Sequence, residues 1–219
     1  MKRRYIIALI FLLSLSTYQI QDNFTINFSQ NIKKITIENN KISQTEKIRD
    51  SLAFLYETNL FSLKTKEIEK NLEKFEFIDS FEIRKKFPDQ IKIKIFEKTP
   101  IAIIQNKKVK KYYTSKGETI NFTKIKEFKN LPLVFGDKQS FGKFYKKLKK
   151  MNYPASEIKS FYLFESKRWD IITKKNQVIK LPNIGFEKSL KNFILIKDQP
   201  NFDKYKTFDY RITDQLILN

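Results

Sequence analysis

Apolar and charged residues alternate in the segment Gln90–Lys98, where Ile91, Ile93 and Ile95 are separated by single lysines. Successive side chains of a β-strand point to opposite faces, so this pattern predicts a strand with one apolar and one solvated face. Such a strand is stable only in a sheet whose apolar face is covered by other elements. The segment therefore excludes an all-helical fold and a disordered chain.

Two further strands are predicted before this segment. The first is centred on Ile35 and Ile37, and the second contains Phe81 and Ile83, each pair alternating with polar residues. A turn at Phe87-Pro88-Asp89 then leads into the segment Gln90–Lys98.

Two amphipathic helices are predicted between the first two strands. Ser43 and Glu46 have the spacing of a capping box that opens the first helix, and the second helix starts near Thr65. Their apolar faces consist of Ile48, Leu52, Leu55 and Tyr56 in the first helix and Ile68, Leu72 and Phe75 in the second. The predicted order over residues 31–99 is β-α-α-β-β, with both helices on one face of a three-stranded sheet.

The second half of the chain, residues 100–219, is predicted to be rich in strands and to contain two helices. The helices are marked by apolar residues at helical spacing, from Phe141 to Met151 and from Phe186 to Ile194. The strands are expected at 101–104, 109–114, 119–122, 158–164, 168–173, 177–181 and 207–213, and 131–136 is expected to be a buried apolar segment. The fold class is therefore α+β.

The N-terminus is predicted to meet a membrane. Lys2, Arg3 and Arg4 precede the uncharged segment Tyr5–Gln21, whose 17 residues are near the shortest length that spans a bilayer. The basic cluster favours a cytoplasmic N-terminus with all later residues outside. The segment alone fits a retained anchor or a signal peptide cleaved near Ser14-Leu15-Ser16.

Composition excludes several functions. The chain of 219 residues has no His and no Cys, which removes the usual zinc sites and the His-dependent nucleophiles. Its net charge of +20 (44 basic minus 24 acidic residues) comes mainly from dispersed lysines, and arginine, the residue suited to reading bases, is scarce. We expect a solvated lysine-rich surface, with no nucleic acid, no cofactor, no metal and no small-molecule substrate.

The run from Ile83 to Ala102 resembles a motif of the FtsQ/DivIB family of bacterial cell-division proteins. The matching positions are Arg84, Pro88, Glu97, Pro100 and Ala102. Leu131–Gly136, Arg168-Trp169 and Phe208–Arg211 resemble further motifs of this family, and the β-α-α-β-β order resembles its POTRA domain. The resemblance covers essentially the whole chain.

The resemblance implies a division of the chain into five parts. They are a cytoplasmic stub at 1–4, a retained single membrane span at 5–21, a linker at 22–30, a POTRA domain at 31–99 and an FtsQ/DivIB-type β-domain at 100–219. It implies a protein of the bacterial inner (plasma) membrane, at the division septum, with its C-terminal part outside the cytoplasm. It also implies a non-enzymatic divisome scaffold that binds the small proteins FtsB and FtsL through its last strands and other division proteins through the POTRA domain.

The last predicted strand is the candidate binding site. A chain that ends in a strand with no following element is expected to leave that strand at a sheet edge, where it can pair with a partner. Arg211 could bind a partner carboxylate with two hydrogen bonds. The interface candidates are Asp209, Tyr210, Arg211, Ile212, Leu216 and Ile217, with Arg168 beside the same sheet.

Two other classes of function remain open from the residues alone. One is a POTRA-containing outer-membrane assembly or secretion factor. The other is a secreted cell-wall enzyme, for which Glu97, Asp170, Asp209 and Asp214 are carboxylates that a glycosidase could pair.

Overall fold

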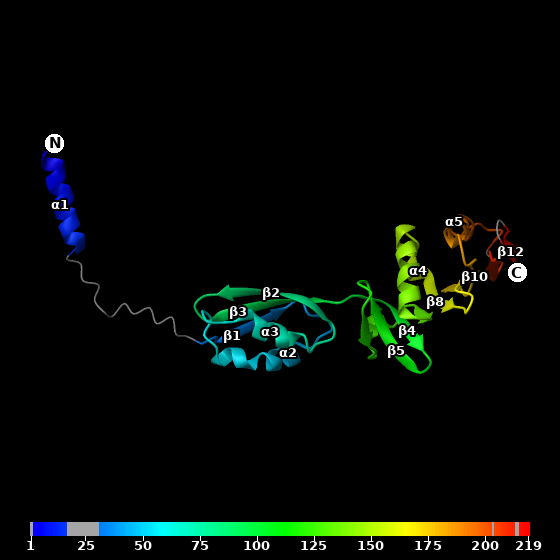
Figure 1. Ribbon diagram of the computed structural model, residues 1–219, viewed down its shortest axis with the longest axis horizontal. Coiled ribbons are helices and arrows are strands. Elements are labelled where there is room, and N and C mark those ends of the chain that lie inside the picture. The colour runs from blue at the N-terminus through cyan, green and yellow to red at the C-terminus, as the bar shows by residue number, and fades with distance from the viewer. Residues whose placement is uncertain (1, 17–30, 203, 213–214) are drawn as a thin grey trace.

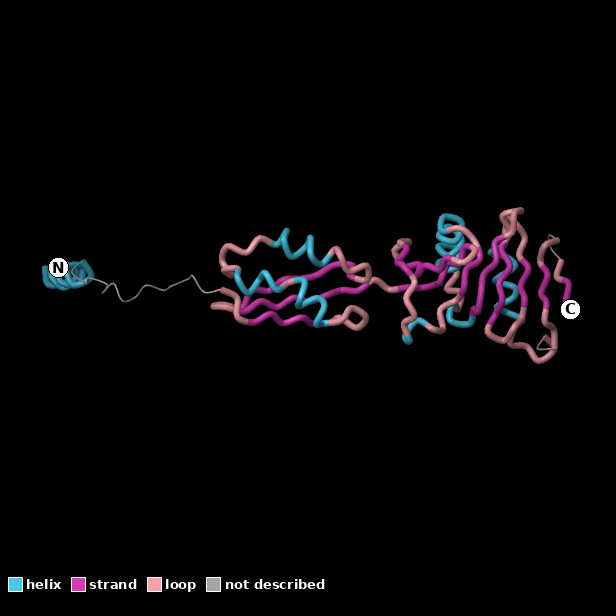
Figure 2. The backbone as a smooth tube through the Cα atoms, turned by 90° about the horizontal axis from the view of Figure 1, so that it is seen from below, coloured by secondary structure: helices cyan, strands magenta, loops and turns pink. Residues whose placement is uncertain are grey.

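A computed structural model describes residues 2–16, 31–202, 204–212 and 215–219. The chain forms two separate sheets, and each sheet has its own helices packed against it (Figures 1 and 2). The first sheet has three strands and the second has nine.

The first domain has the predicted order of elements. They are β1 (Lys34–Glu38), α2 (Thr45–Ser51), a 3₁₀ helix (Ala53–Glu57), α3 (Thr65–Leu72), β2 (Ile78–Lys86) and β3 (Gln90–Glu97). The β3 strand lies in the middle of the sheet, parallel to β1 and antiparallel to β2. Ile91, Ile93 and Ile95 are at most 1% exposed and share one core cluster with residues of both helices. The prediction that this segment forms a strand with one apolar, buried face is therefore confirmed.

Two details of the first helix differ from the prediction. The helix starts at Thr45 after Gln44, which makes no side-chain cap bond, so the capping box of Ser43 and Glu46 is wrong. The backbone N–H of Ser43 donates instead to the carboxylate of Glu97. Tyr56 is exposed because the chain leaves the α-helix after Ser51 and continues as a 3₁₀ helix, which shifts the apolar face.

The second domain contains β4 to β12 and two α-helices within the described residues. The strands are β4 (Pro100–Asn106), β5 (Val109–Thr114), β6 (Thr119–Asn121), β7 (Leu133–Phe135), β8 (Ile158–Leu163), β9 (Trp169–Thr173), β10 (Val178–Lys180), β11 (Thr207–Asp209) and β12 (Ile217–Leu218). The helices are α4 (Lys138–Lys150) and α5 (Phe186–Ile196), and 3₁₀ turns occur at Lys126–Phe128 and Ala155–Glu157. The order across the sheet is β12-β11-β10-β9-β8-β7-β4-β5-β6.

Helices α4 and α5 cover one face of this sheet. Phe141 and Phe144 of α4 and Phe193 of α5 are buried in the same core cluster as Phe161 and Ile171 of the central strands. Successive side chains of a strand point to opposite faces of the sheet. The residues that lie between the buried ones along β7 to β11 therefore point to the opposite face. Among the described residues, neither α4 nor α5 covers that second face, and the 3₁₀ turn Lys126–Phe128 packs at its β7 end with Leu133 (Figure 2).

The end of the chain corrects the sequence prediction. The strand expected at 207–213 stops at Asp209, and β11 lies between β10, to which it is parallel, and β12, to which it is antiparallel. The edge of the sheet is therefore β12. Thr213 and Asp214 lie outside the described residues.

Aromatic packing joins the two domains. The ring of Phe77, just before β2, lies 6.0 Å from Tyr112 and 6.2 Å from Phe128, measured between centroids. Beside it, Lys116 Nζ lies 2.6 Å from Asp79 Oδ2. Side chains at and just before the start of β2 in the first domain thus contact the second domain.

At the N-terminus, α1 spans Lys2–Ser16. Among the described residues, no helix has both the length and the hydropathy required to cross a membrane. The last part of the predicted span, 17–21, and the predicted linker 22–30 lie outside the described residues.

Candidate partner-binding surface

Three charged side chains form a row across the open face of β9, β10 and β11. In the strand register, Lys180 lies opposite Asp170 on one side and Asp209 on the other. Directly paired residues point to the same face, so one lysine stands between two carboxylates. The lysine Nζ lies 3.9 Å from Asp209 Oδ2.

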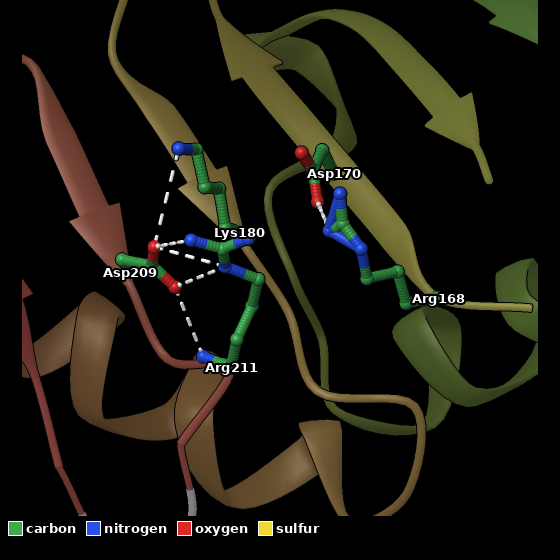
Figure 3. A network of polar contacts seen from close by, with 5 residues as sticks. All are labelled: Arg168, Asp170, Lys180, Asp209 and Arg211. Carbon is green, nitrogen blue, oxygen red and sulfur yellow. Dashed lines mark hydrogen bonds and ion pairs between the residues drawn. The ribbon is translucent and has the colours of Figure 1, made fainter. Parts of the chain in front are cut away.

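An arginine neighbours each carboxylate of this row (Figure 3). Arg211 donates from Nε to both oxygens of Asp209, at 2.9 and 3.0 Å, and from Nη2 to Oδ2 at 2.7 Å. Arg168 Nη1 lies 3.4 Å from Asp170 Oδ1, and its guanidinium carbon lies 3.9 Å from the ring centroid of Phe164. Arg211 was predicted to bind a partner carboxylate, and it already holds one from its own chain.

Burial and neighbouring cations set the protonation of the two carboxyls. Asp170 is 6% exposed, and this desolvation raises its pKa although Arg168, Lys180 and Arg211 oppose the shift. Asp209 is 7% exposed, but its hydrogen bonds from Arg211 lower its pKa. With both carboxylates ionised, three cations face two anions. The cluster keeps an excess positive charge that favours a further carboxylate.

An apolar groove of about 460 Å³ lies at the same end of the sheet. Its lining includes Ile184, Ile212 and Leu216, and the first two are 87% and 52% exposed. Tyr210 contributes to the wall, is buried, and donates from its hydroxyl to Asn192 Oδ1 at 2.8 Å. The strand ends at Asp209, before both residues, yet Tyr210 and Ile212 line the same groove, with Tyr210 buried and Ile212 exposed to solvent.

The edge strand β12 offers backbone hydrogen-bonding groups beside the groove. Asn219 exchanges two backbone hydrogen bonds with Thr207, at 2.8 and 3.2 Å. Since the backbone groups of successive residues point to opposite sides of a strand, those of Leu218 point away from β11. Ile217 is half exposed beside them. This edge can accept another strand.

The other motif residues lie away from this surface, in turns and strands of the two domains. Arg84 is exposed on β2 with its Nη2 3.7 Å from Glu82 Oε2, and Pro88 lies in the β2–β3 turn. Pro100 and Ala102 are buried at the start of β4. The carboxylate of Glu97 accepts hydrogen bonds of 2.7 to 3.1 Å from the backbone N–H groups of residues 41, 42 and 43.

Sequence reasoning missed Lys180 and considered Asp170 only as a catalytic candidate. A signal was present, because the predicted turn 174–176 pairs Thr173 with Gln177 and so brings Asp170 opposite Lys180. The pairing of Lys180 with Asp209 had no such signal, since α5 and the following loop separate the two strands.

The described residues do not gather a metal-binding set. Nowhere in them do three or more His, Cys, Asp or Glu side chains come together in a way that could hold a metal ion. Asp170 and Asp209 lie on strands separated by β10, and each is paired with an arginine. Asp214 lies outside the described residues.

Comparison with protein families matches both domains. Residues 30–98 match the FtsQ-type POTRA domain, and residues 102–211 match the C-terminal domain of the cell division proteins FtsQ and DivIB. The chain is 31% identical over 194 residues to the cell division protein FtsQ of Rickettsia prowazekii, covering 87% of this chain and 68% of that protein. It is 30% identical over 194 residues to FtsQ of Rickettsia typhi, with the same coverage.

A more distant match is the cell division protein DivIB of Bacillus cytotoxicus, 30% identical over 91 residues, which is 42% of this chain and 36% of that protein. The architecture is thus that of a POTRA-containing bacterial cell division protein. The chain belongs to the FtsQ/DivIB family.

Proposed function

We propose that this protein is a non-enzymatic scaffold of the division septum that binds the membrane proteins FtsB and FtsL through the C-terminal end of its β-domain. The observation that carries the proposal is that three binding features lie at the same end of the second sheet. They are the free side of β12, the apolar groove beside it and the cationic cluster of Arg168, Lys180 and Arg211.

Each feature suits a different part of one extended partner segment. The outward backbone groups of β12 pair with its backbone, which provides affinity with little sequence preference. The groove lined by Ile184, Ile212 and Leu216 takes an apolar side chain. Arg211, which follows β11, binds an acidic side chain of the added strand and fixes its register, and Arg168, beyond β10, adds positive charge to the same face.

We further propose that residues 5–21 anchor the chain in the inner membrane. The cluster Lys2, Arg3 and Arg4 would keep the N-terminus in the cytoplasm, so that the POTRA domain (31–99) and the β-domain (100–219) lie outside it. The exposed apolar side chains of α1 within the described residues support this arrangement. In this arrangement the POTRA domain is placed to contact other division proteins.

The test is a tagged fusion imaged in dividing cells, together with recovery of FtsB and FtsL on the tagged protein. We expect a band at the septum and both partners in the eluate. Diffuse membrane fluorescence with neither partner recovered would contradict the proposal.

A further inference from the structure

Two exposed aromatic rings meet at one end of the POTRA domain. Phe87 in the β2–β3 turn is 61% exposed, and Phe61 in the loop before α3 is 48% exposed. Their ring centroids lie 5.0 Å apart. Together the two rings form a small exposed apolar patch that another surface can contact.

Lysines surround this pair. The exposed lysines of the flanking strands and loops are Lys33, Lys34, Lys64, Lys85 and Lys86. The register of the sheet places Lys34 and Lys86 beside Gln90, at the same end as the turn. Asp89, the carboxylate of the turn, lies 3.5 Å from Lys33 Nζ. The turn, β1 and the loop before α3 thus form a cationic tip with an aromatic centre, which we call the lysine-aromatic tip.

The tip is the end at which the chain joins the domain from its N-terminal helix. Asn31 bridges to Asn59 at this end, next to the loop that carries Phe61. Fourteen residues separate Asn31 from Ser16, the last residue of α1. A chain of that length spans at most about 50 Å. An anchor formed by α1 therefore tethers the domain to the bilayer at the tip, within about 50 Å, while the β-domain is attached at the opposite end of the sheet (Figure 1).

We propose that the lysine-aromatic tip docks on the anionic lipid surface of the membrane that holds α1, with Phe61 and Phe87 at head-group depth. The inference rests on the proposed membrane anchor. Aromatic rings are enriched at this depth, and lysines near the surface are attracted to anionic lipids. Docking fixes the POTRA domain upright and holds the β-domain away from the membrane.

The absence of cysteine from the chain allows a direct test. The full chain carrying S62C, next to Phe61, is labelled with an environment-sensitive fluorophore and reconstituted in phosphatidylcholine vesicles with or without phosphatidylglycerol. Lipids with spin labels on their acyl chains act as quenchers. We expect quenching at S62C in vesicles that contain phosphatidylglycerol, and its reversal by salt. The same label at K108C, in the exposed β4–β5 turn, is the control and should stay unquenched.

Two variants identify the groups responsible. We expect F61S/F87S to lose most of the quenching and K85E/K86E to reduce it to the level seen without phosphatidylglycerol. All these side chains are exposed, so the thermal unfolding of the variants should match that of the parent chain. The K85E/K86E variant keeps the test valid if the double serine variant folds poorly.

The outcomes separate the tip from the anchor. A chain that floats with vesicles but leaves S62C as unquenched as K108C overturns docking and leaves the anchor intact. A chain that does not float overturns both. A spectral shift at S62C that depends on protein density and is insensitive to the lipid quencher identifies a second copy as the occupant and also overturns lipid docking.

Discussion

Glu97 shows how one side chain fixes the path of the chain in the first domain. Glu97 is the last residue of β3. Its carboxylate accepts hydrogen bonds from the backbone N–H groups of residues 41–43 and so orients the loop that leads into α2. We expect E97Q to lower the free energy of unfolding by about 1–3 kcal/mol, because hydrogen bonds to a charged acceptor are lost. Urea denaturation measures this change. E82Q, at an exposed residue of β2, is the matched control and should change stability little.

The pH dependence of this effect has a definite sign. Burial raises the pKa of Glu97, but the backbone N–H groups outweigh it and bring the folded-state pKa below the ordinary value of 4.5. The stabilisation is therefore complete above pH 4.5 and is lost as the pH falls through the lowered pKa. The stability difference between the parent chain and E97Q should shrink below pH 4.5. A difference that is constant down to pH 2 would contradict the carboxylate's role.

At the residue scale, the sequence identified the positions of motif residues better than it identified the residues that they contact. Glu97 and Arg211 are both motif residues, but nothing in the sequence indicates that Glu97 binds the backbone of a loop 54 to 56 residues away. The Arg211–Asp209 pair is only two residues apart, yet it requires the strand to end after Asp209 so that the arginine can fold back. Such contacts depend on where elements end.

Among the elements, α4 depends on a close approach to the sheet. A Cβ atom at Gly142 would lie 2.6 Å from the hydroxyl oxygen of Tyr113 on β5. Alanine normally stabilises a helix interior by about 1 kcal/mol relative to glycine. We expect G142A to lower stability in the parent chain and to raise it in a Y113F background, as measured by a double-mutant cycle in urea. Equal effects in the two backgrounds would contradict the close contact.

Asn219, directly after the edge strand β12, protects two backbone amides at the start of β11. The N–H groups of Lys206 and Thr207 both donate to the carbonyl oxygen of Asn219, at 2.7 and 2.8 Å. We expect deletion of residues 215–219 to speed hydrogen exchange at both amides and to weaken partner binding, while the rest of the fold persists. The amide of Tyr210, which donates to Lys180 on the other side, is the internal control and should stay protected.

At the scale of elements, most of the fold followed from periodicity. The helix at Phe141–Met151 and the three strands of the meander were predicted because each buries one face of a regular pattern. The last strand was predicted too long because Phe208, Tyr210 and Ile212 alternate with polar residues. The backbone leaves the sheet after Asp209, and two further residues near the end of the chain occupy its edge.

For the whole molecule, we expect Phe77 to fix the relative orientation of the two domains. Its ring packs against Tyr112 and Phe128, and β2 and β4 run on from this contact. We expect F77A to broaden the distance distribution between spin labels at K70C in α3 and K149C in α4. Y56A, which truncates an exposed ring of the first domain, should leave the distribution unchanged. An equally narrow distribution in F77A would show that Phe77 does not fix the orientation.

The central claim is that the cationic cluster and the edge of β12 bind the partner together. The most direct measurement is a calorimetric titration of the purified chain with the extracytoplasmic segments of FtsB and FtsL. We predict that R168E and R211E each weaken binding by about tenfold or more, whereas K191E, an exposed lysine of α5, leaves the affinity unchanged. Thermal unfolding of R211E is compared with that of the parent chain, because Asp209 loses its Arg211 hydrogen bonds and keeps Lys180 at 3.9 Å. Undiminished affinity in both arginine variants would contradict the account.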